Sequence, residues 1–192
     1  LRHNNIPFFS TPSHSTDLDF LLQQGVNLIK IGSDDCSNFP FIKLCVETGL
    51  PVVASTGMAR LHEIDQMAEL LEPAENKAIL HCVTNYPASL SEQNLRTIST
   101  FKDTFTGFEI GFSDHSNSKM VACLALAMGA TIFENHVMFD DQDFGYDRAV
   151  SMPISQVKDF IQQLDQAKEA LGSPLKKMSD AELINRENNR KS

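Results

Sequence analysis

Short β-rich runs alternate with longer segments of helical periodicity along the chain, and each run ends in small polar residues. The predicted strands are 7–11, 27–33, 52–56, 78–84, 108–115 and 131–137. The predicted helices are 16–24, 39–48, 61–71, 91–105, 118–128 and 155–171. Gly25, Gly49 and Gly129 stand where helices should end, and Pro51 opens the strand that follows Gly49. The pattern therefore predicts repeated βα units and a parallel sheet.

Two architectures are built from repeated βα units, the closed eight-stranded barrel and the open doubly wound sheet. A doubly wound nucleotide-binding sheet usually carries a glycine-rich phosphate loop, and neither G-x-G-x-x-G nor G-x-x-x-x-G-K-[ST] occurs here. Every predicted strand ends in polar residues instead, as the C-terminal rim of a barrel requires. These residues are Ser10, Thr11, Lys30, Ser33, Ser55, Thr56, Thr84, Asn85, Ser113, His115, Glu134 and His136. The sequence predicts an α/β fold, a (β/α)8 TIM barrel represented by about six units.

The number of units also bears on domain organisation, because six units do not close an eight-stranded barrel. Residues 1–5 resemble the tail of a helix, so we expect two further strands before this stretch of sequence. We expect one partial TIM-barrel domain over residues 1–172 and a C-terminal linker or tail over residues 173–192.

Strand alternation places one lysine inside the predicted barrel. Ile29 and Ile31 share one face of their strand, which we expect to pack against the outer helices. Lys30 then points the opposite way, and a buried cation needs an anion. Because hydroxyl groups share this inward face, the arrangement suits a bound phosphate.

Two histidines end successive strands in the segments F-E-I-G-F-S-D-H-S and T-I-F-E-N-H-V. A single strand histidine is more often a core residue, so the prediction depends on the pair His115 and His136. Two neutral imidazoles with open coordination positions suit a catalytic divalent metal. Asp147 follows in a loop that we expect to lie over the barrel mouth.

Composition and charge indicate which binding partners and which cellular compartment to expect. The formal net charge of −9 and a pI near 5.0 argue against nucleic acid and anionic membrane as partners. The four cysteines are scattered without C-x-x-C pairing, as is typical of reduced cytosolic thiols. The sequence has no apolar run of membrane-spanning length and no signal-peptide pattern, so we expect a soluble cytoplasmic protein.

Six ordered motifs carry a family resemblance: F-F-S-T-P, I-K-I-G-S, S-T-G-M, L-H-C-V-T-N-Y-P, G-F-S-D-H-S and F-E-N-H. Together they resemble the N-acetylneuraminate (sialic acid) synthase family, over residues 8 to about 151. The resemblance implies a TIM barrel that condenses phosphoenolpyruvate with an amino-sugar aldehyde, such as N-acetylmannosamine or a relative. It also implies a divalent metal, Mn²⁺ or Mg²⁺, and a homodimer in the full-length protein.

The resemblance implies a role for each matching residue. His115 and His136 would hold the metal, Tyr86 would line the sugar side, and Asp147 would contact the sugar or a metal-bound water. Lys30, Glu134 and Asp147 are the candidate catalytic residues. The phosphate and carboxylate of phosphoenolpyruvate would be surrounded by Thr11, Lys30, Ser33, Ser55, Thr84 and Ser113.

Some positions depart from the family pattern, and two other functions stay open. Asn135 stands where the family usually has lysine or arginine, although strand alternation turns it away from the site. The first two strands and the C-terminal antifreeze-like domain of the family have no counterpart in this stretch. The first alternative, which Asn135 and these missing parts make plausible, is a non-catalytic module that binds a metal or a sugar phosphate. The second alternative is a class I aldolase in which Lys30 forms a Schiff base.

Overall fold

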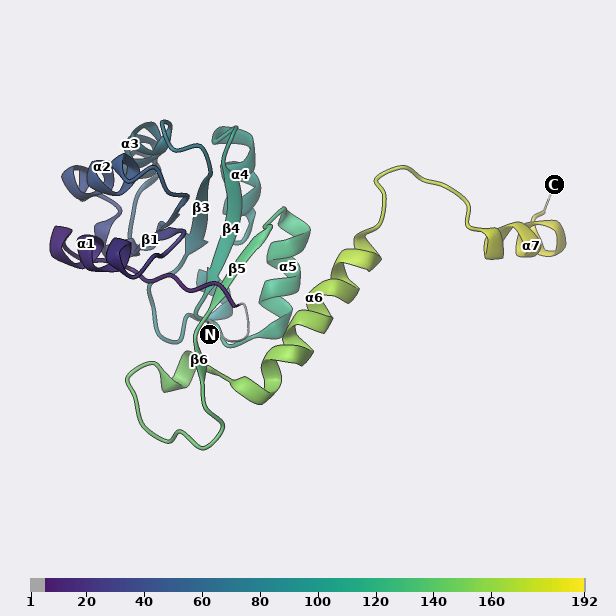
Figure 1. Cartoon of the computed structure of the whole chain (residues 1–192). Helices are drawn as coiled ribbons and strands as arrows, with labels where there is room; N and C mark the ends of the chain where they lie inside the picture. Colours follow the sequence, from purple (N-terminus) through teal and green to yellow (C-terminus); the bar gives the residue numbers. More distant parts are fainter. Residues whose placement is uncertain (1–5, 192) are drawn as a thin grey trace.

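A curled parallel sheet forms the centre of the molecule in the computed structural model, which describes residues 6–191 (Figure 1). Its strands run in the order β1-β2-β3-β4-β5, and every neighbouring pair is parallel. Their bounds are Ile29–Ile31, Val52–Ser55, Lys77–Cys82, Glu109–Asp114 and Ile132–Asn135. Because the strand order never reverses, the sheet is part of a barrel rather than a doubly wound sheet. The prediction of an incomplete TIM barrel is confirmed.

Helices cover the outer, convex side of this sheet (Figure 1). Their bounds are α1 Ser15–Gln23, α2 Phe39–Glu47, α3 Leu61–Leu71, α4 Arg96–Thr104, α5 Lys119–Met128 and α6 Val157–Leu171. In α3, the buried residues Ile64, Met67, Ala68 and Leu71 recur at helical spacing and therefore form one face. This face packs into the main core, which also contains the strand residues of the outward face.

Smaller elements complete the chain. The short parallel strands β6 (Val137–Met138) and β7 (Met152–Pro153) hold the base of the loop that joins them. Single 3₁₀ turns span Ser33–Asp35, Leu90–Glu92, Arg148–Val150 and Ile154–Gln156. The last helix, α7 (Asp180–Asn189), stands away from the sheet at the end of an extended segment after α6 (Figure 1). Residues 6–191 include no helix with the length and apolar character that crossing a bilayer would take.

The predicted first strand, residues 7–11, is wrong. This segment is extended but forms no strand, and Phe8 and Phe9 remain 45% and 46% exposed. A strand is stabilised by neighbours that pair with its backbone and cover its side chains, and residues 7–11 pair with no strand of the sheet, whose order is β1-β2-β3-β4-β5. The expected helical tail over residues 1–5 lies outside the described residues.

Helix α4 begins at Arg96, later than the predicted residue 91. Leu90–Glu92 forms a separate 3₁₀ turn, and Asn94 has a φ of 43°. This left-handed conformation cannot belong to a right-handed helix, so it separates the turn from α4. Within the predicted tail, Ser179 caps a helix instead: it accepts a hydrogen bond from the Glu182 backbone N–H at 3.2 Å.

Candidate active site

A cavity of about 280 Å³ opens at the C-terminal ends of the strands. Every predicted site residue except Asp147 lines it, so the structure brings together side chains from all five strand ends and from the N-terminal segment. The lining residues are Thr11, Lys30, Gly32, Ser33, Asp34, Ser55, Met58, Cys82, Thr84, Tyr86, Ser113, His115, Glu134 and His136. This is the edge at which TIM-barrel enzymes carry their active sites.

Lys30 projects from β1 into this cavity and is only 5% exposed. Its Nζ donates to Ser55 Oγ at 2.8 Å and to the Ile31 carbonyl at 2.9 Å. Glu134 Oε2 lies 3.5 Å away and accepts a further bond from Ser55 Oγ at 3.4 Å. Ile29 is fully buried on the opposite face. The inward direction predicted from strand alternation is therefore confirmed.

Hydroxyl groups surround the cation. Ser33 Oγ accepts a hydrogen bond from the Gly57 backbone N–H at 3.0 Å. Thr84 Oγ1 is buried and has no hydrogen-bond partner among residues 6–191. A side chain at Gly57 would collide with this hydroxyl, so glycine permits the close approach. A buried hydroxyl without a partner, in a cavity that also holds an ammonium group, suits an anionic ligand.

The two histidines lie side by side, with ring centroids 5.2 Å apart. His115 Nδ1 lies 2.8 Å from the Val83 carbonyl, and His136 Nδ1 lies 3.6 Å from Asp147 Oδ2. Since a carbonyl only accepts, His115 carries a hydrogen on Nδ1, and in the neutral ring the lone pair lies on Nε2. Metal-binding histidines commonly direct the N–H of one ring nitrogen at a carbonyl or carboxylate in this way. The donor set therefore fits a divalent metal.

No other donors join this pair in the part of the chain that the structure describes: it contains no group of three or more His, Cys, Asp or Glu arranged to hold a metal ion. Two protein nitrogens would leave several coordination positions for substrate or water, as in catalytic rather than structural sites.

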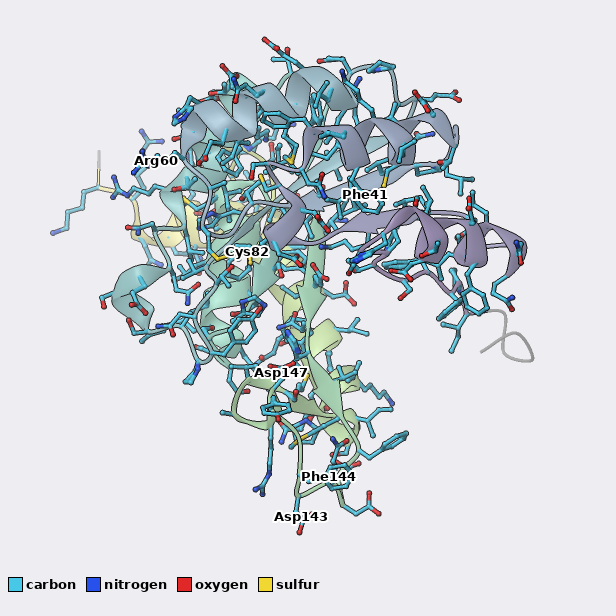
Figure 2. All side chains as sticks on the ribbon, turned by 90° about the vertical axis from the view of Figure 1, so that its left-hand side faces the viewer. Phe41, Arg60, Cys82, Asp143, Phe144 and Asp147 are labelled. Atoms are coloured by element: carbon cyan, nitrogen blue, oxygen red, sulfur yellow. The ribbon has the colours of Figure 1, made fainter. Side chains whose placement is uncertain are left out.

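Asp147 lies on the loop between β6 and β7, beside the cavity rather than in its lining. Figure 2 shows it between the loop tip, with Asp143 and Phe144, and the body of the molecule around Cys82. Its carboxylate faces His136. The loop therefore lies at the barrel mouth, as predicted, and its base is held by a hydrogen bond from Ser151 Oγ to the Asp147 carbonyl at 2.8 Å.

Comparison with known proteins agrees with this geometry. A profile of the NeuB family matches residues 1–176. The chain belongs to the NeuB family. Its resemblance to sialic acid synthases, inferred from six motifs, is thereby confirmed.

Relatives of this NeuB chain include synthases of several sugar acids. It is 36% identical over 184 residues to the N,N'-diacetyllegionaminic acid synthase of Legionella pneumophila, covering 93% of this chain and 51% of that protein. It is 30% identical over 181 residues to the N-acetylneuraminate-9-phosphate synthase of Mus musculus, covering 93% and 50%. The chain thus spans about half the length of these curated relatives.

A solved structure also matches the fold. The N-acetylneuraminic acid (sialic acid) synthetase of Leptospira borgpetersenii, determined in complex with citrate, superposes with a TM-score of 0.89 at 30% identity. The match covers 100% of this chain and 68% of that one. The partial barrel therefore superposes on about two thirds of that longer chain.

Sequence reasoning missed several residues of the cavity in this NeuB chain: Gly32, Asp34, Met58 and Cys82. Strand alternation could have found Cys82, because it lies two residues before Thr84 and so shares its face, but we interpreted the cysteine only as a reduced thiol. Met58 gave no sequence signal. Its backbone has a φ of 65°, and its exposed side chain stands at the cavity rim.

Cys82 and His115 influence each other across 3.9 Å. Burial raises the pKa of the Cys82 thiol, but interactions with His115, Ser33 and Ser113 outweigh burial and lower it overall. Burial lowers the pKa of His115, and hydrogen bonding to Cys82 and to the Val83 carbonyl outweighs burial and raises it. The thiol is therefore an electrostatic part of the site.

Proposed function

We propose that this chain forms the part of a sialic-acid-type synthase that binds phosphoenolpyruvate and an amino-sugar aldehyde and condenses them with release of phosphate. One observation carries the proposal: a buried lysine and an unpartnered buried hydroxyl face the same cavity as a histidine pair. N-acetylmannosamine and its relatives are the proposed sugars, because the curated relatives are named as synthases of sugar acids of this type.

Lys30 and the surrounding hydroxyls bind the phosphoenolpyruvate in this proposal. The Lys30 ammonium group holds the phosphate, while Thr84 and Ser33 direct hydroxyl groups at the phosphate or the carboxylate. Thr11, Ser55 and Ser113 complete this donor set. The donors are fixed by the barrel wall before substrate arrives, so little reorganisation is needed when charge develops during the reaction.

The histidine pair would hold the metal ion that activates the aldehyde. Mn²⁺ or Mg²⁺ held there would act as a Lewis acid that polarises the aldehyde carbonyl. The Val83 carbonyl and the Asp147 carboxylate face the Nδ1 atoms of His115 and His136, which leaves each Nε2 available as a ligand. Tyr86 stacks on His115 and covers the sugar side of the site.

The bond changes follow from this placement. The enol carbon of phosphoenolpyruvate attacks the aldehyde carbon, and the aldehyde oxygen takes up a proton to become a hydroxyl. Water then adds to the resulting cationic carbon. Phosphate leaves with cleavage of the carbon–oxygen bond, and the hydroxyl left by the water loses its proton to the phosphate as the ketone forms. Glu134, which lies beside Lys30 inside the cavity, would accept the proton from the added water. Lys30 would stabilise the departing phosphate.

We also propose a cytoplasmic location and a homodimer for the whole protein. All four cysteines are free, three of them buried, as is typical of a reducing compartment. The homodimer is the expectation from the family resemblance.

The test is an assay of phosphate release from phosphoenolpyruvate with Mn²⁺ and, in turn, N-acetylmannosamine, its 6-phosphate and a deoxy diamino sugar. We expect release with at least one sugar and none after Lys30→Met. Binding of phosphoenolpyruvate without release with any sugar would favour the non-catalytic module. Borohydride trapping of a pyruvate adduct on Lys30 would favour the aldolase.

A further inference from the structure

One short segment contacts His115 from several sides. The Val83 carbonyl accepts the Nδ1 hydrogen at 2.8 Å. The Tyr86 ring stacks on the imidazole with centroids 4.2 Å apart and planes at 30°. The Ala88 backbone N–H donates to the His115 carbonyl at 2.9 Å. The hydrogen position, the ring plane and the backbone of His115 are therefore all held by the loop after β3, although His115 itself follows β4.

Glu92 fastens this loop at its far end. Its Oε2 accepts hydrogen bonds from the Ser89 backbone N–H and the Ser89 hydroxyl, both at 2.8 Å. It also accepts from Asn85 Nδ2 at 3.2 Å, and Asn85 Oδ1 in turn accepts the Tyr86 N–H at 3.1 Å. A capping box needs only the serine and the glutamate, so the contact with Asn85 goes beyond capping. It links the 3₁₀ turn to the residue that stacks on His115.

Gln93 fastens the same loop to the core. Its side-chain amide donates to the Ala88 and Ser89 carbonyls, each at 3.3 Å. Its own carbonyl lies 2.7 Å from Nε2 of the buried His81, which packs against Phe112. Since the carbonyl only accepts, His81 donates this bond. The loop is thus tied to the protein interior rather than only to itself.

The turn after β4 does not orient the His115 ring by itself. Asp114 Oδ1 accepts the Ser116 N–H at 2.7 Å, which constrains the backbone on either side of His115. An imidazole on such a backbone can still rotate and exchange its hydrogen between the two ring nitrogens. The contacts that select one orientation and one tautomer come from Val83 and Tyr86 on this loop and from Cys82 at the end of β3, whose Sγ lies 3.9 Å from His115 Nδ1.

We propose that residues 83–93 form a positioning clamp for His115, in which Tyr86 and Glu92 are positioning residues. The clamp keeps the hydrogen on Nδ1 and the lone pair on Nε2. Its consequence for metal affinity rests on the proposed function, because only there does His115 bind a metal. Groups that orient a ligating histidine commonly change metal affinity by about 10- to 100-fold when removed.

The test measures two properties of the 192-residue chain and its variants. Nitrogen-15 NMR of the metal-free protein, recorded at a pH at which the His115 ring is neutral, reports the His115 tautomer, with the resonance assigned through His115→Gln. Calorimetry with Mn²⁺ reports affinity. We expect Tyr86→Ala and Glu92→Ala to mix the two tautomers and to weaken Mn²⁺ binding about tenfold or more. Tyr86→Phe, which keeps the ring, and Glu69→Ala, an exposed carboxylate on α3, should match the parent in both measurements.

Asn85→Ala provides a milder variant if Glu92→Ala does not fold, because it spares the bonds between Ser89 and Glu92. If His115 keeps the parent's tautomer in the folded Tyr86→Ala and Asn85→Ala variants, the clamp proposal is wrong, whether or not the Mn²⁺ affinity changes. Mixed tautomers with unchanged Mn²⁺ affinity would support the clamp and refute His115 as a metal ligand. The two ideas can therefore fail separately.

Discussion

At the scale of single residues, two buried polar groups in the cavity are better suited to binding a ligand than to stabilising the fold. Lys30 is enclosed in the barrel wall, where desolvation of its ammonium group costs free energy, and its polar contacts there are with Ser55, Ile31 and Glu134. Thr84 Oγ1 likewise gains nothing from its burial in the ligand-free protein. Both side chains should therefore matter more to binding than to folding.

Lys30→Met tests this expectation. Phosphoenolpyruvate should raise the melting temperature of the parent, because ligand that binds only the folded state stabilises it. The variant should lose this shift and, without ligand, be at least as stable as the parent. Differential scanning fluorimetry with and without phosphoenolpyruvate measures both. An equal ligand-induced shift in parent and variant would mean that Lys30 does not face the phosphate.

The buried His81 should make the stability of the folded protein depend on pH. Burial lowers its pKa, and the bond to the Gln93 carbonyl offsets only part of that effect. The unfolded chain, with an ordinary histidine pKa of about 6.5, then binds more protons than the folded protein as pH falls. This contribution to stability is present above pH 6.5 and is lost as pH falls below it.

We therefore expect the drop in melting temperature between pH 7 and pH 5 to be smaller in His81→Gln than in the parent. His62→Gln is the control, since His62 is exposed on α3 and should leave the drop unchanged. An equal drop in the parent and in His81→Gln would contradict the assignment of a neutral, buried His81.

At the scale of elements, a helix such as α3 is held against the core by one apolar face, and its exposed face contributes little to stability. Met67 in α3 is fully buried in the main core, whereas Glu69 on the same helix is exposed. Met67→Ala should lower the free energy of unfolding by about 2–5 kcal/mol, because it removes buried atoms and leaves a cavity. Glu69→Ala should change it by less than about 0.5 kcal/mol. Urea denaturation followed by circular dichroism measures both, and comparable losses would contradict the packing of α3.

At the scale of the whole molecule, the tail is separate from the barrel. Helix α7 makes its polar contacts locally, through Ser179 and Glu182 and through the ion pair of Lys176 with Glu182 at 3.7 Å. Figure 1 shows it away from the sheet. Deletion of residues 173–192 should therefore shift the melting temperature by less than about 2 °C. A larger fall would show that the tail packs on the domain, contrary to the predicted boundary at residue 172.

The sequence by itself determined the repeating units, the direction of Lys30 and the gathering of most site residues at one edge. Residues two apart on a strand share a face, and parallel strands end at the same edge, so these features follow from local pattern. The same reasoning placed His115 and His136 together, which their ring separation of 5.2 Å confirms.

Only the tertiary structure decided which contacts the loops make and whether residues 7–11 join the sheet as a strand. The bond between His115 and Val83, the approach of Asp147 to His136 and the unpartnered Thr84 hydroxyl depend on loop paths that no periodicity encodes. Residues 7–11 have a strand-like sequence but form no strand, because a strand also needs a neighbour in space. Local pattern specifies which way a side chain points, whereas long-range packing specifies what it meets.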